Sequence, residues 1–373
     1  MTQLDLPGVR PRELSLRGHK PPVVFAPSTE FHAELKRQVD DYFQAARQSR
    51  RDLPMMYVKT AVLAAWYAAS YGLLYFHPNS ALESLVYSIS LGLAMAGIAF
   101  NVAHDAGHGT YSASPRINRC MSVALDLLGG SSYVWKWKHN YLHHNYTNVV
   151  GADDDIDFGF LGRLAPDRPL RGIYMYQYLY FWLLYGLLPF SWQYYDFARL
   201  LRGRIGTHPM PRPRGWDLVT VVAGKTLFAV LMFVLPALYL PIGTVLIYFV
   251  MVSFTLGWTM AVVFQLAHCV EKAAFTSPPA DSGRMKNEWA VHQIETTVDF
   301  SRRNRLLTWY LGGLNFQVEH HLFPKICHLH YPALSHIVER HCSRFGVRYS
   351  EHRTIFDAVR SHYRFLRRSP SQD

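Results

Sequence analysis

The stretch that decides the fold reads LESLVYSISLGLAMAGIAFNVAHDAGH and covers residues 82–108. Residues 82–103 are apolar and long enough to cross a lipid bilayer, which takes about 20 helical residues. The stretch ends in His104-Asp-Ala-Gly-His108. Side chains four residues apart share one face of a helix. The sequence therefore predicts a pair of metal-binding histidines where a membrane span emerges.

Two more histidine clusters repeat this pattern, and they read His139-Asn-Tyr-Leu-His143-His144 and Gln317-Val-Glu-His320-His321. In an α-helix, His139 and His143 share a face, and His144 lies a further 100° round, where it can reach a second metal ion. Neutral imidazole suits iron, copper, zinc and nickel. We therefore expect one site for two metal ions, with these seven histidines as its ligands.

Other residues near the clusters are candidate ligands or hydrogen-bond partners of ligands. His268 ends an apolar stretch and is an eighth candidate ligand, because ionisable residues at such places are often functional. His292 is a weaker candidate, and Gln317 could ligate through its carbonyl oxygen or hold a metal-bound water. Carboxylates can fix the tautomer of a ligating imidazole, and the candidates are Asp105, Glu271, Glu319 and the run Asp153-Asp154-Asp155-Ile-Asp157. The run equally fits a solvated loop, and the surface is the expected place for His328, His330, His336 and His341.

Four apolar stretches predict an all-α polytopic membrane protein. They cover residues 58–76, 82–103, 218–240 and 244–267, and short uncharged connections pair them into two hairpins. Arginines crowd the opposite ends, so the positive-inside rule places those ends and both termini in the cytoplasm. Residues 104–217 and 268–368 would then form a cytoplasmic helical cap that holds the two-metal histidine site.

The remaining segments are assigned around this frame. Residues 173–195 are apolar but rich in tyrosine, so we interpret them as interfacial or re-entrant, which keeps all three clusters on one side. Residues 1–56 form an N-terminal segment whose helix carries Phe31, Leu35, Val39 and Phe43 on one stripe, for core packing or for membrane attachment. Residues 57–368 form one membrane domain that ends in helices at 333–345 and about 354–368, and residues 369–373 are a tail.

Composition narrows the possible partners. The 373 residues are 50% hydrophobic and carry a formal net charge of +11. We find no nucleic-acid-binding motif, so anionic lipid headgroups or an acidic protein partner fit the charge better. Candidate cations for a substrate headgroup are Lys136, Lys138, Lys325, Arg302 and Arg303. The four cysteines show no paired spacing, which indicates no disulfide framework.

Three extended motifs resemble membrane fatty acid desaturases. They are Asn101-Val-Ala-His-Asp-Ala-Gly-His-Gly109, Lys138-His-Asn-Tyr-Leu-His-His-Asn-Tyr-Thr-Asn148 and Asn315-Phe-Gln-Val-Glu-His-His-Leu-Phe-Pro324. Gln317, in place of the first histidine of the third cluster, resembles the front-end subgroup, the delta-6 and delta-5 enzymes of linoleoyl-CoA type. The resemblance implies an enzyme that uses O2 to insert a cis double bond into a CoA-linked or lipid-linked acyl chain.

The resemblance also implies a non-haem diiron centre held by the seven histidines, with His268 as an extra ligand. The chain lacks the His-Pro-Gly-Gly motif of a fused cytochrome b5 domain. It therefore resembles the bacterial form, in which a separate ferredoxin or cytochrome b5, with its reductase, supplies electrons at the inner membrane.

Other functions fit parts of the sequence. A diiron hydroxylase of fatty acids or sphingolipids would use the same ligands. A zinc-dependent membrane lipid hydrolase would need about three histidines and one open position, which leaves at least four histidines unexplained. A non-catalytic metal-binding or lipid-receptor protein is the third alternative. Metal content and O2 dependence separate these classes, while the double-bond position, the acyl length and the acyl carrier stay open.

Overall fold

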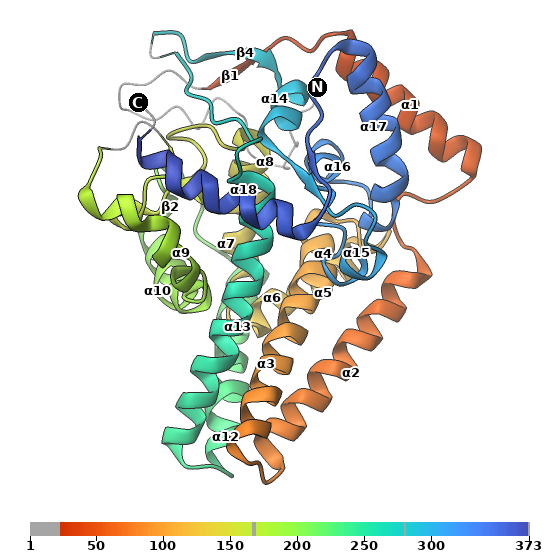
Figure 1. Cartoon of the computed structure of the whole chain (residues 1–373). Helices are drawn as coiled ribbons and strands as arrows, with labels where there is room; N and C mark the ends of the chain where they lie inside the picture. The colour runs from red at the N-terminus through yellow and green to blue at the C-terminus, as the bar shows by residue number, and fades with distance from the viewer. Residues whose placement is uncertain (1–22, 166–168, 280, 372–373) are drawn as a thin grey trace.

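The computed structural model describes residues 23–165, 169–279 and 281–371, and it is mostly helical (Figure 1). Residues 1–22 of the predicted N-terminal segment and residues 372–373 of the predicted tail lie outside the described residues. Long helices run together into a stem, which consists of α2, α3 and α11 to α13. The other described elements form a cap at one end of the stem.

The first half of the stem is a helical hairpin. Helix α2 covers Pro54–Phe76 and packs against α3, which covers Ala81–Ile98. The Ser80 hydroxyl and the Glu83 carboxylate cap the start of α3 reciprocally. The helix then continues through a π-helical turn, η2 (Ala99–Ala103), into α4 (His104–His108). The apolar stretch therefore delivers the first histidine pair into the cap without a break.

The second half of the stem repeats this plan. Helix α11 (Trp216–Ala229) continues through the π-helical turn η7 (Val230–Val234) into α12 (Leu235–Ala237), and α13 (Ile242–His268) returns to the cap. A Cβ atom at Gly92 of α3 would lie 2.6 Å from the Cβ of Thr255 in α13. Glycine at this position therefore allows the two hairpins to approach closely.

Three helical runs are long and apolar enough to cross a membrane: Ala81–His108, Trp216–Ala237 and Ile242–His268. They cover all or most of three of the four predicted spans, since the run that ends at Ala237 stops three residues before the end of the predicted span 218–240. The predicted span at residues 58–76 forms α2, whose tyrosines and Lys59 make it less apolar. Three spans are thus supported by length and composition, and the fourth crossing stays a prediction.

Residues 173–195 do not form one straight helix. They divide among a 3₁₀ turn, η6 (Gly172–Tyr176), and two helices, α9 (Gln177–Tyr185) and α10 (Leu188–Arg202). The break falls just before Pro189, because proline suits the first turn of a new helix. Both helices pack against α13. The predicted interfacial position of this segment stays a prediction.

Short elements build the rest of the cap before and after the second hairpin. Before it come α5 (Pro115–Ser122), α6 (Ala124–Leu127), α7 (Ser132–Trp135), the π-helix η3 (Lys136–His143), α8 (His144–Tyr146), η4 (Asp154–Ile156) and η5 (Gly159–Leu161). After it come α14 (Trp289–Thr296), α15 (Arg305–Tyr310), α16 (Gln317–Leu322) and η8 (His328–His330). These pieces carry the second and third histidine clusters.

The cap also contains short strands, which the all-α prediction did not include. Strand β1 (Val24–Ala26) pairs in parallel with β4 (Arg284–Glu288), with Val24 opposite Arg284. Strand β2 (Arg204–Ile205) pairs antiparallel with β3 (His208–Pro209), and β5 (Asp299–Phe300) pairs in parallel with β6 (Glu351–His352). Each pair joins only a few residues, so the strands fasten loops together without forming a sheet core.

Helices from both ends of the chain close the cap. Helix α1 (Glu30–Ala46) begins at Thr29, whose side chain accepts a hydrogen bond from the Phe31 amide. Its predicted apolar stripe is buried against residues of α14, α16 and α17 (Tyr331–Phe345), so the stripe packs in the core. Helix α17 ends at Phe345, where the predicted helix also ends, and α18 (Ile355–Arg368) follows, with η9 (Ser369–Ser371) after it.

Candidate metal centre

The cap brings all three histidine clusters and His268 together. The eight rings come from α4, η3, α8, α16 and the last residue of α13. Every one of them is buried, with at most 9% of the residue exposed. Contacting ring centroids lie between 4.4 Å, for His144 and His321, and 5.9 Å, for His139 and His320. Segments far apart in the sequence thus form one compact imidazole cluster.

The ring nitrogens fall into groups that suit two metal ions. One group contains His104, His108, His139 and His320, and another contains His143, His268 and His321. Within each group the ligand atoms lie within 4.8 Å of one another. His144 forms a third group with His320 and His321, and so it lies between the other two. The spacing predicted His139 and His143 on one helix face, but the two residues belong to different groups here, and His268 completes the group of His143.

Several buried ring nitrogens have no hydrogen-bond partner in the described part of the chain. They include Nε2 of His104, His108, His143 and His320, and Nδ1 of His144 and His268. Nδ1 of His104 also has no hydrogen bond, but it faces the Asp105 carboxylate at 3.5 Å. Burying an unpaired polar atom is unfavourable, so such atoms usually have a function. Metal ions bound among them would satisfy these lone pairs. The residues therefore fit a metal centre of imidazole ligands.

The second cluster departs from the α-helical geometry that its spacing suggested. Residues Lys136–His143 form a π-helix, whose hydrogen bonds join residues five apart. The His144 amide accordingly donates to the His139 carbonyl, and the two residues lie one turn apart. Their Nε2 atoms approach to 3.1 Å. The prediction that His144 points 100° away from His143 on a regular α-helix is therefore wrong.

Aromatic side chains enclose the cluster. The Trp135 ring stacks on His139 at 4.5 Å, and Phe264 contacts both His143 and His268. Gly107 makes room for this wall, because a Cβ there would lie 2.2 Å from a carbon of the Trp135 ring. The glycine between the first two histidines thus allows an indole to cover the site.

Carboxylates hold two of the rings, as predicted for Asp105 and for the aspartate run. Nδ1 of His143 lies 3.0 Å from Oδ2 of Asp153 and 3.6 Å from Asp155. Nδ1 of His104 lies 3.5 Å from Oδ1 of Asp105. A proton on each Nδ1 leaves Nε2 as the lone-pair donor. The aspartate run therefore contacts a candidate ligand and is not simply a solvated loop.

Neutral groups contact three further rings. Nδ1 of His321 lies 2.8 Å from Oε1 of Gln293 and 3.1 Å from the Thr147 hydroxyl. Nδ1 of His320 lies 3.3 Å from the hydroxyl of Tyr331. The amide nitrogen of Gln317 lies 2.9 Å from Nε2 of His268, and the predicted ligation through its carbonyl oxygen stays a prediction. Gln293, Thr147 and Tyr331 were missed, since no spacing rule connects them to the clusters.

Three candidate partners lie away from the rings. Glu271 forms ion pairs with Arg364 and Arg368 instead. Glu319 points toward Asp299 and the Tyr349 hydroxyl, and burial together with Asp299 raises the pKa of Glu319 well above its usual value. His292 forms no hydrogen bond with a histidine of the cluster among the described residues. Its Nε2 lies 2.9 Å from the Thr147 carbonyl instead. The predictions for Glu271, Glu319 and His292 as direct partners are therefore wrong, because position along a helix does not give side-chain direction.

Burial keeps most of the imidazoles neutral. Burial, and then repulsion from neighbouring histidines, lowers the pKa of His139, His144, His320 and His321 well below 6.5. Burial alone would also lower the pKa of His143, but Asp153 and Asp155 raise it overall. A neutral ring offers a lone pair to a metal ion, whereas a protonated ring cannot. The cluster is thus prepared to ligate at neutral pH.

Comparison with known sequences identifies the family. Residues 80–353 match the fatty acid desaturase family. The chain is 38% identical to the sn-1 linoleoyl-lipid 6-desaturase of Arthrospira platensis over 93% of its length and 94% of that protein. The chain belongs to the fatty acid desaturase family. It is similar to two further proteins: the enzyme of the same name from Synechocystis sp., at 38% identity over 92% of this chain and 96% of that protein, and the acyl-lipid (8-3)-desaturase of Physcomitrium patens, at 35% over 92% and 72%.

These comparisons confirm the predicted activity. The desaturase is an oxidoreductase that acts on fatty acyl chains, and its relatives support the front-end type. All three histidine clusters lie inside the matched region. The matched region also contains the three apolar helical runs of a membrane protein. The family is consistent with an iron-dependent, O2-using enzyme, and the desaturase has a cluster that could bind metal.

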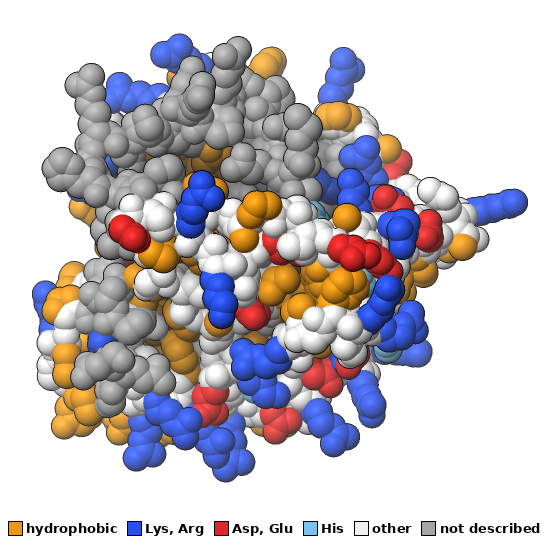
Figure 2. Space-filling model, turned by 90° about the horizontal axis from the view of Figure 1, so that it is seen from above, with side chains coloured by type: hydrophobic (Ala, Val, Ile, Leu, Met, Phe, Trp, Pro, Cys, Tyr) orange, Lys and Arg blue, Asp and Glu red, His pale blue; other side chains and the backbone are white. Residues whose placement is uncertain are grey.

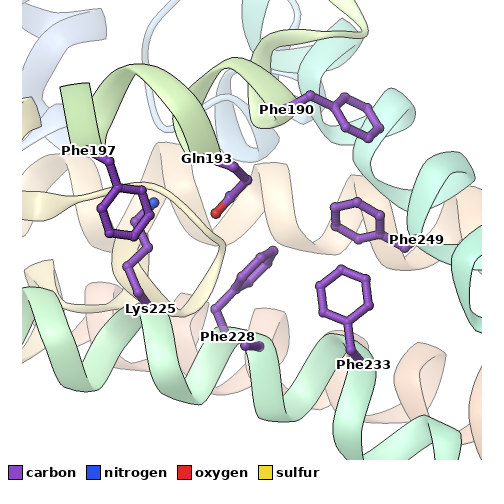
Figure 3. Close-up of a pocket in the computed structure, with 8 residues that line it drawn as sticks. Phe190, Gln193, Phe197, Lys225, Phe228, Phe233 and Phe249 are labelled. Carbon is purple, nitrogen blue, oxygen red and sulfur yellow. The ribbon is translucent and has the colours of Figure 1, made fainter. Parts of the chain in front are cut away.

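One apolar pocket of the desaturase lies apart from the histidines (Figure 3). It has a volume of about 460 Å³ and lies between α10 and the two arms of the second stem hairpin, which are α11 with η7 and α13. Its lining residues are Phe190, Gln193, Phe197, Lys225, Phe228, Ala229, Phe233 and Phe249. Lys225 is held by the Gly129 carbonyl at 2.6 Å and by Asp196 at 3.3 Å. No histidine lines this pocket, so it is not part of the metal cluster.

The desaturase also buries histidines that we expected on its surface. His328, His330 and His341 are at most 5% exposed, whereas His336 is exposed as predicted. His330 contacts the Ser49 carbonyl and His341 the Phe31 carbonyl, so both connect cap helices to the N-terminal segment. His328 contacts Asp105. Three of the candidate headgroup cations are likewise engaged: Lys138 pairs with Asp155, Arg302 pairs with Glu339 and Glu351, and Lys325 donates to the His108 carbonyl at 2.9 Å.

Proposed function

We propose that the desaturase introduces a cis double bond at the 6 position of linoleoyl chains carried on membrane lipids. The support is the near-complete match, at 38% identity, to two proteins named sn-1 linoleoyl-lipid 6-desaturase. A lipid-linked substrate also suits a site at the end of apolar helices. A CoA-linked substrate and the delta-5 position are the alternatives that the motifs share with it.

We further propose that two iron ions bind in the cluster. One ion would be held by His104, His108, His139 and His320, the other by His143, His268 and His321, with His144 beside both. Imidazole ligands suit iron, and the unpaired buried ring nitrogens fit this role. Bound iron, with O2 and two electrons, would supply the oxidising power needed to remove hydrogen from unactivated methylene carbons.

The protein's own contribution is orientation and exclusion of water. Asp153 and Gln293 hold the rings of His143 and His321 by their Nδ1 atoms. Such contacts fix the tautomer and the direction of each ligand. Trp135 and Phe264 cover the rings, so bulk water is kept from the reacting carbon atoms. Exclusion of water restricts the oxidation to the acyl chain.

We infer that four helices cross the membrane and that the cap and both termini face the cytoplasm. Helix α2 is 23 residues long, which is enough to span a bilayer, and it packs along α3. Both observations support a membrane crossing by α2 beside that of α3. Helix α1 packs against α17 in the cap, so both ends of the chain would lie on one side. For a bacterial cell the membrane would be the inner one.

We propose that a separate ferredoxin or cytochrome b5 delivers the electrons. Figure 2 shows Lys and Arg side chains around the edge of the cap, seen from above. The formal net charge of +11 would attract an acidic carrier and speed its docking. Salt screens such attraction. Turnover that stays the same from low to high salt would contradict this assignment.

A lipid profile tests the proposed reaction. The chain is expressed in a host supplied with linoleate, and mass spectrometry locates new double bonds in each lipid class. We expect a bond at the 6 position, and we expect His320→Ala to abolish it, because His320 joins two of the ligand groups.

His336→Ala is the matched control, because His336 is exposed on α17 and should leave the product unchanged. A hydroxylated product would instead overturn the proposed reaction while keeping the metal centre. A product with His320→Ala would contradict the ligand assignment. Product on CoA but on no lipid class would assign the other acyl carrier.

A further inference from the structure

A buried chain of polar groups lies behind His104. Lys59 of α2, His328 of η8 and Asp105 of α4 are each at most 2% exposed. The Lys59 ammonium lies 2.8 Å from Nε2 of His328, and Nδ1 of His328 lies 2.9 Å from Oδ2 of Asp105. Oδ1 of the same carboxylate faces Nδ1 of His104 at 3.5 Å. A row of four polar residues from three elements therefore leads from Lys59 to His104, a candidate metal ligand.

The ammonium group fixes the direction of these hydrogen bonds. An ammonium has three N–H donors and no acceptor. Nε2 of His328 must therefore accept from Lys59, which puts the proton of the neutral ring on Nδ1. That N–H donates to Oδ2 of Asp105. Oδ1 is then left to accept from Nδ1 of His104, so Nε2 of His104 keeps its lone pair for a metal ion.

The same residues could be mistaken for another metal site. Ligand atoms of Asp105, Cys327 and His328 lie within 4.8 Å of one another. However, the Lys59 ammonium already contacts Nε2 of His328 and lies 5.3 Å from the centre of the Trp309 ring. A second cation would be repelled by this buried charge. The lysine thus supplies the positive charge that a metal ion would otherwise bring.

We propose that Lys59 is a positioning residue for the metal centre. Acting through His328 and Asp105, it sets the tautomer and the orientation of His104. The inference rests on the proposed function, because it assigns His104 as a metal ligand. It explains why a fully buried lysine occupies a helix of the stem, where a charge without a partner would be unfavourable. Lys59 touches neither the substrate nor the metal.

Metal binding, rather than turnover, tests the proposal. Purified full-length chains are freed of metal and titrated with Fe²⁺ in detergent without O2. We compare wild type with Lys59→Met, His328→Leu, the double variant and Lys59→Arg. Loss of such outer partners typically weakens metal affinity 10- to 100-fold. We expect that loss for Lys59→Met and for His328→Leu, and little further loss for the double variant, because both act through Asp105.

The matched control is Lys225→Met. Lys225 is a partly buried lysine of the stem, and it pairs with Asp196 instead of a histidine. We expect the iron affinity of Lys225→Met to stay within about twofold of wild type. Arginine also donates hydrogen bonds and accepts none, so Lys59→Arg should keep more of the iron affinity than Lys59→Met does. Helical content and elution volume of the metal-free chains show whether each variant is folded. If Lys59→Met does not fold, His328→Leu is used to test the proposal instead.

The outcomes separate the possible failures. Wild type that binds no iron would overturn the metal centre itself. Wild type that binds two iron ions, beside a Lys59→Met chain of equal affinity, would overturn the role of Lys59 alone. An equal loss in Lys225→Met would show general weakening of the stem and would also overturn it. Losses that add in the double variant would mean that Lys59 and His328 act separately, which contradicts the chain of hydrogen bonds.

Discussion

At His143, one carboxylate decides which ring nitrogen is free. Oδ2 of Asp153 accepts from the Asn148 amide at 2.9 Å and lies 3.0 Å from Nδ1 of His143. The Asn148 amide therefore helps to hold the carboxylate in position beside the His143 ring. Nε2 of His143 has no partner among the described residues and is left for a metal ion. Neutral groups contact His320 and His321, whereas His143 has a negatively charged partner, as His104 does in Asp105.

Asp153→Asn should weaken metal binding without unfolding the cap. The amide keeps the size of the side chain but loses the charge and can present a donor to Nδ1, which favours the wrong tautomer of His143. We expect about a 10- to 100-fold loss of iron affinity, measured by anaerobic titration. Asp41→Asn, on the exposed side of α1, is the control. Equal affinities of the two variants would contradict this role.

Local sequence patterns identified the candidate ligands but only some of their partners. Histidine spacing gives seven of the eight clustered rings, and the end of an apolar stretch gives His268. Their neighbours come from distant segments, as Gln293 does for His321. The direction of a side chain depends on packing, and for that reason Glu271 was assigned wrongly and His328 was expected on the surface. Partner residues therefore require the folded chain.

Among the elements, the helices were predicted better than their internal geometry. Both hairpins follow from apolar stretches, and the buried stripe of α1 and the end of α17 at Phe345 agree with the predicted helices. The π-helical turns do not, although one precedes His104 and another contains His139 and His143. A π-turn adds a residue to a helical turn, and tertiary packing has to stabilise it. Such turns often occur at functional sites, as they do here.

Helix α1 contributes to the stability of the cap that carries the third cluster. Leu35 is fully buried and belongs to one apolar cluster with Val318 and Leu322 of α16. Leu35→Ala would leave a cavity there, and such changes cost about 2–5 kcal/mol. We expect a clearly lower Tm in detergent. Gln44→Ala, exposed on the same helix, should change it little, and equal Tm values would show that α1 does not stabilise the cap.

The whole molecule places the tips of both hairpins at the far end of the stem from the cap (Figure 1). Cysteine labelling tests the four proposed crossings. In a Cys120→Ser background, since the other three cysteines are buried, Asn79→Cys and Gly243→Cys should react with an impermeant maleimide outside intact cells. Gln44→Cys and His336→Cys should react only after the cells are opened. Labelling of Asn79→Cys and Gln44→Cys from the same side would contradict the crossing of α2.

The order of the clusters along the chain has a consequence for biosynthesis. The ribosome completes His144 long before His320, which lies 176 residues later. At about 5–20 residues per second, that interval lasts roughly 9–35 s. During it, the nascent chain presents five of the eight imidazoles, and six once His268 is made, without the helix that completes the enclosure. Divalent copper and zinc bind such ligands more tightly than ferrous iron does. Which metal enters first should then depend on what the cell has free near its membrane, so a correct cofactor calls for controlled delivery of iron after synthesis is complete.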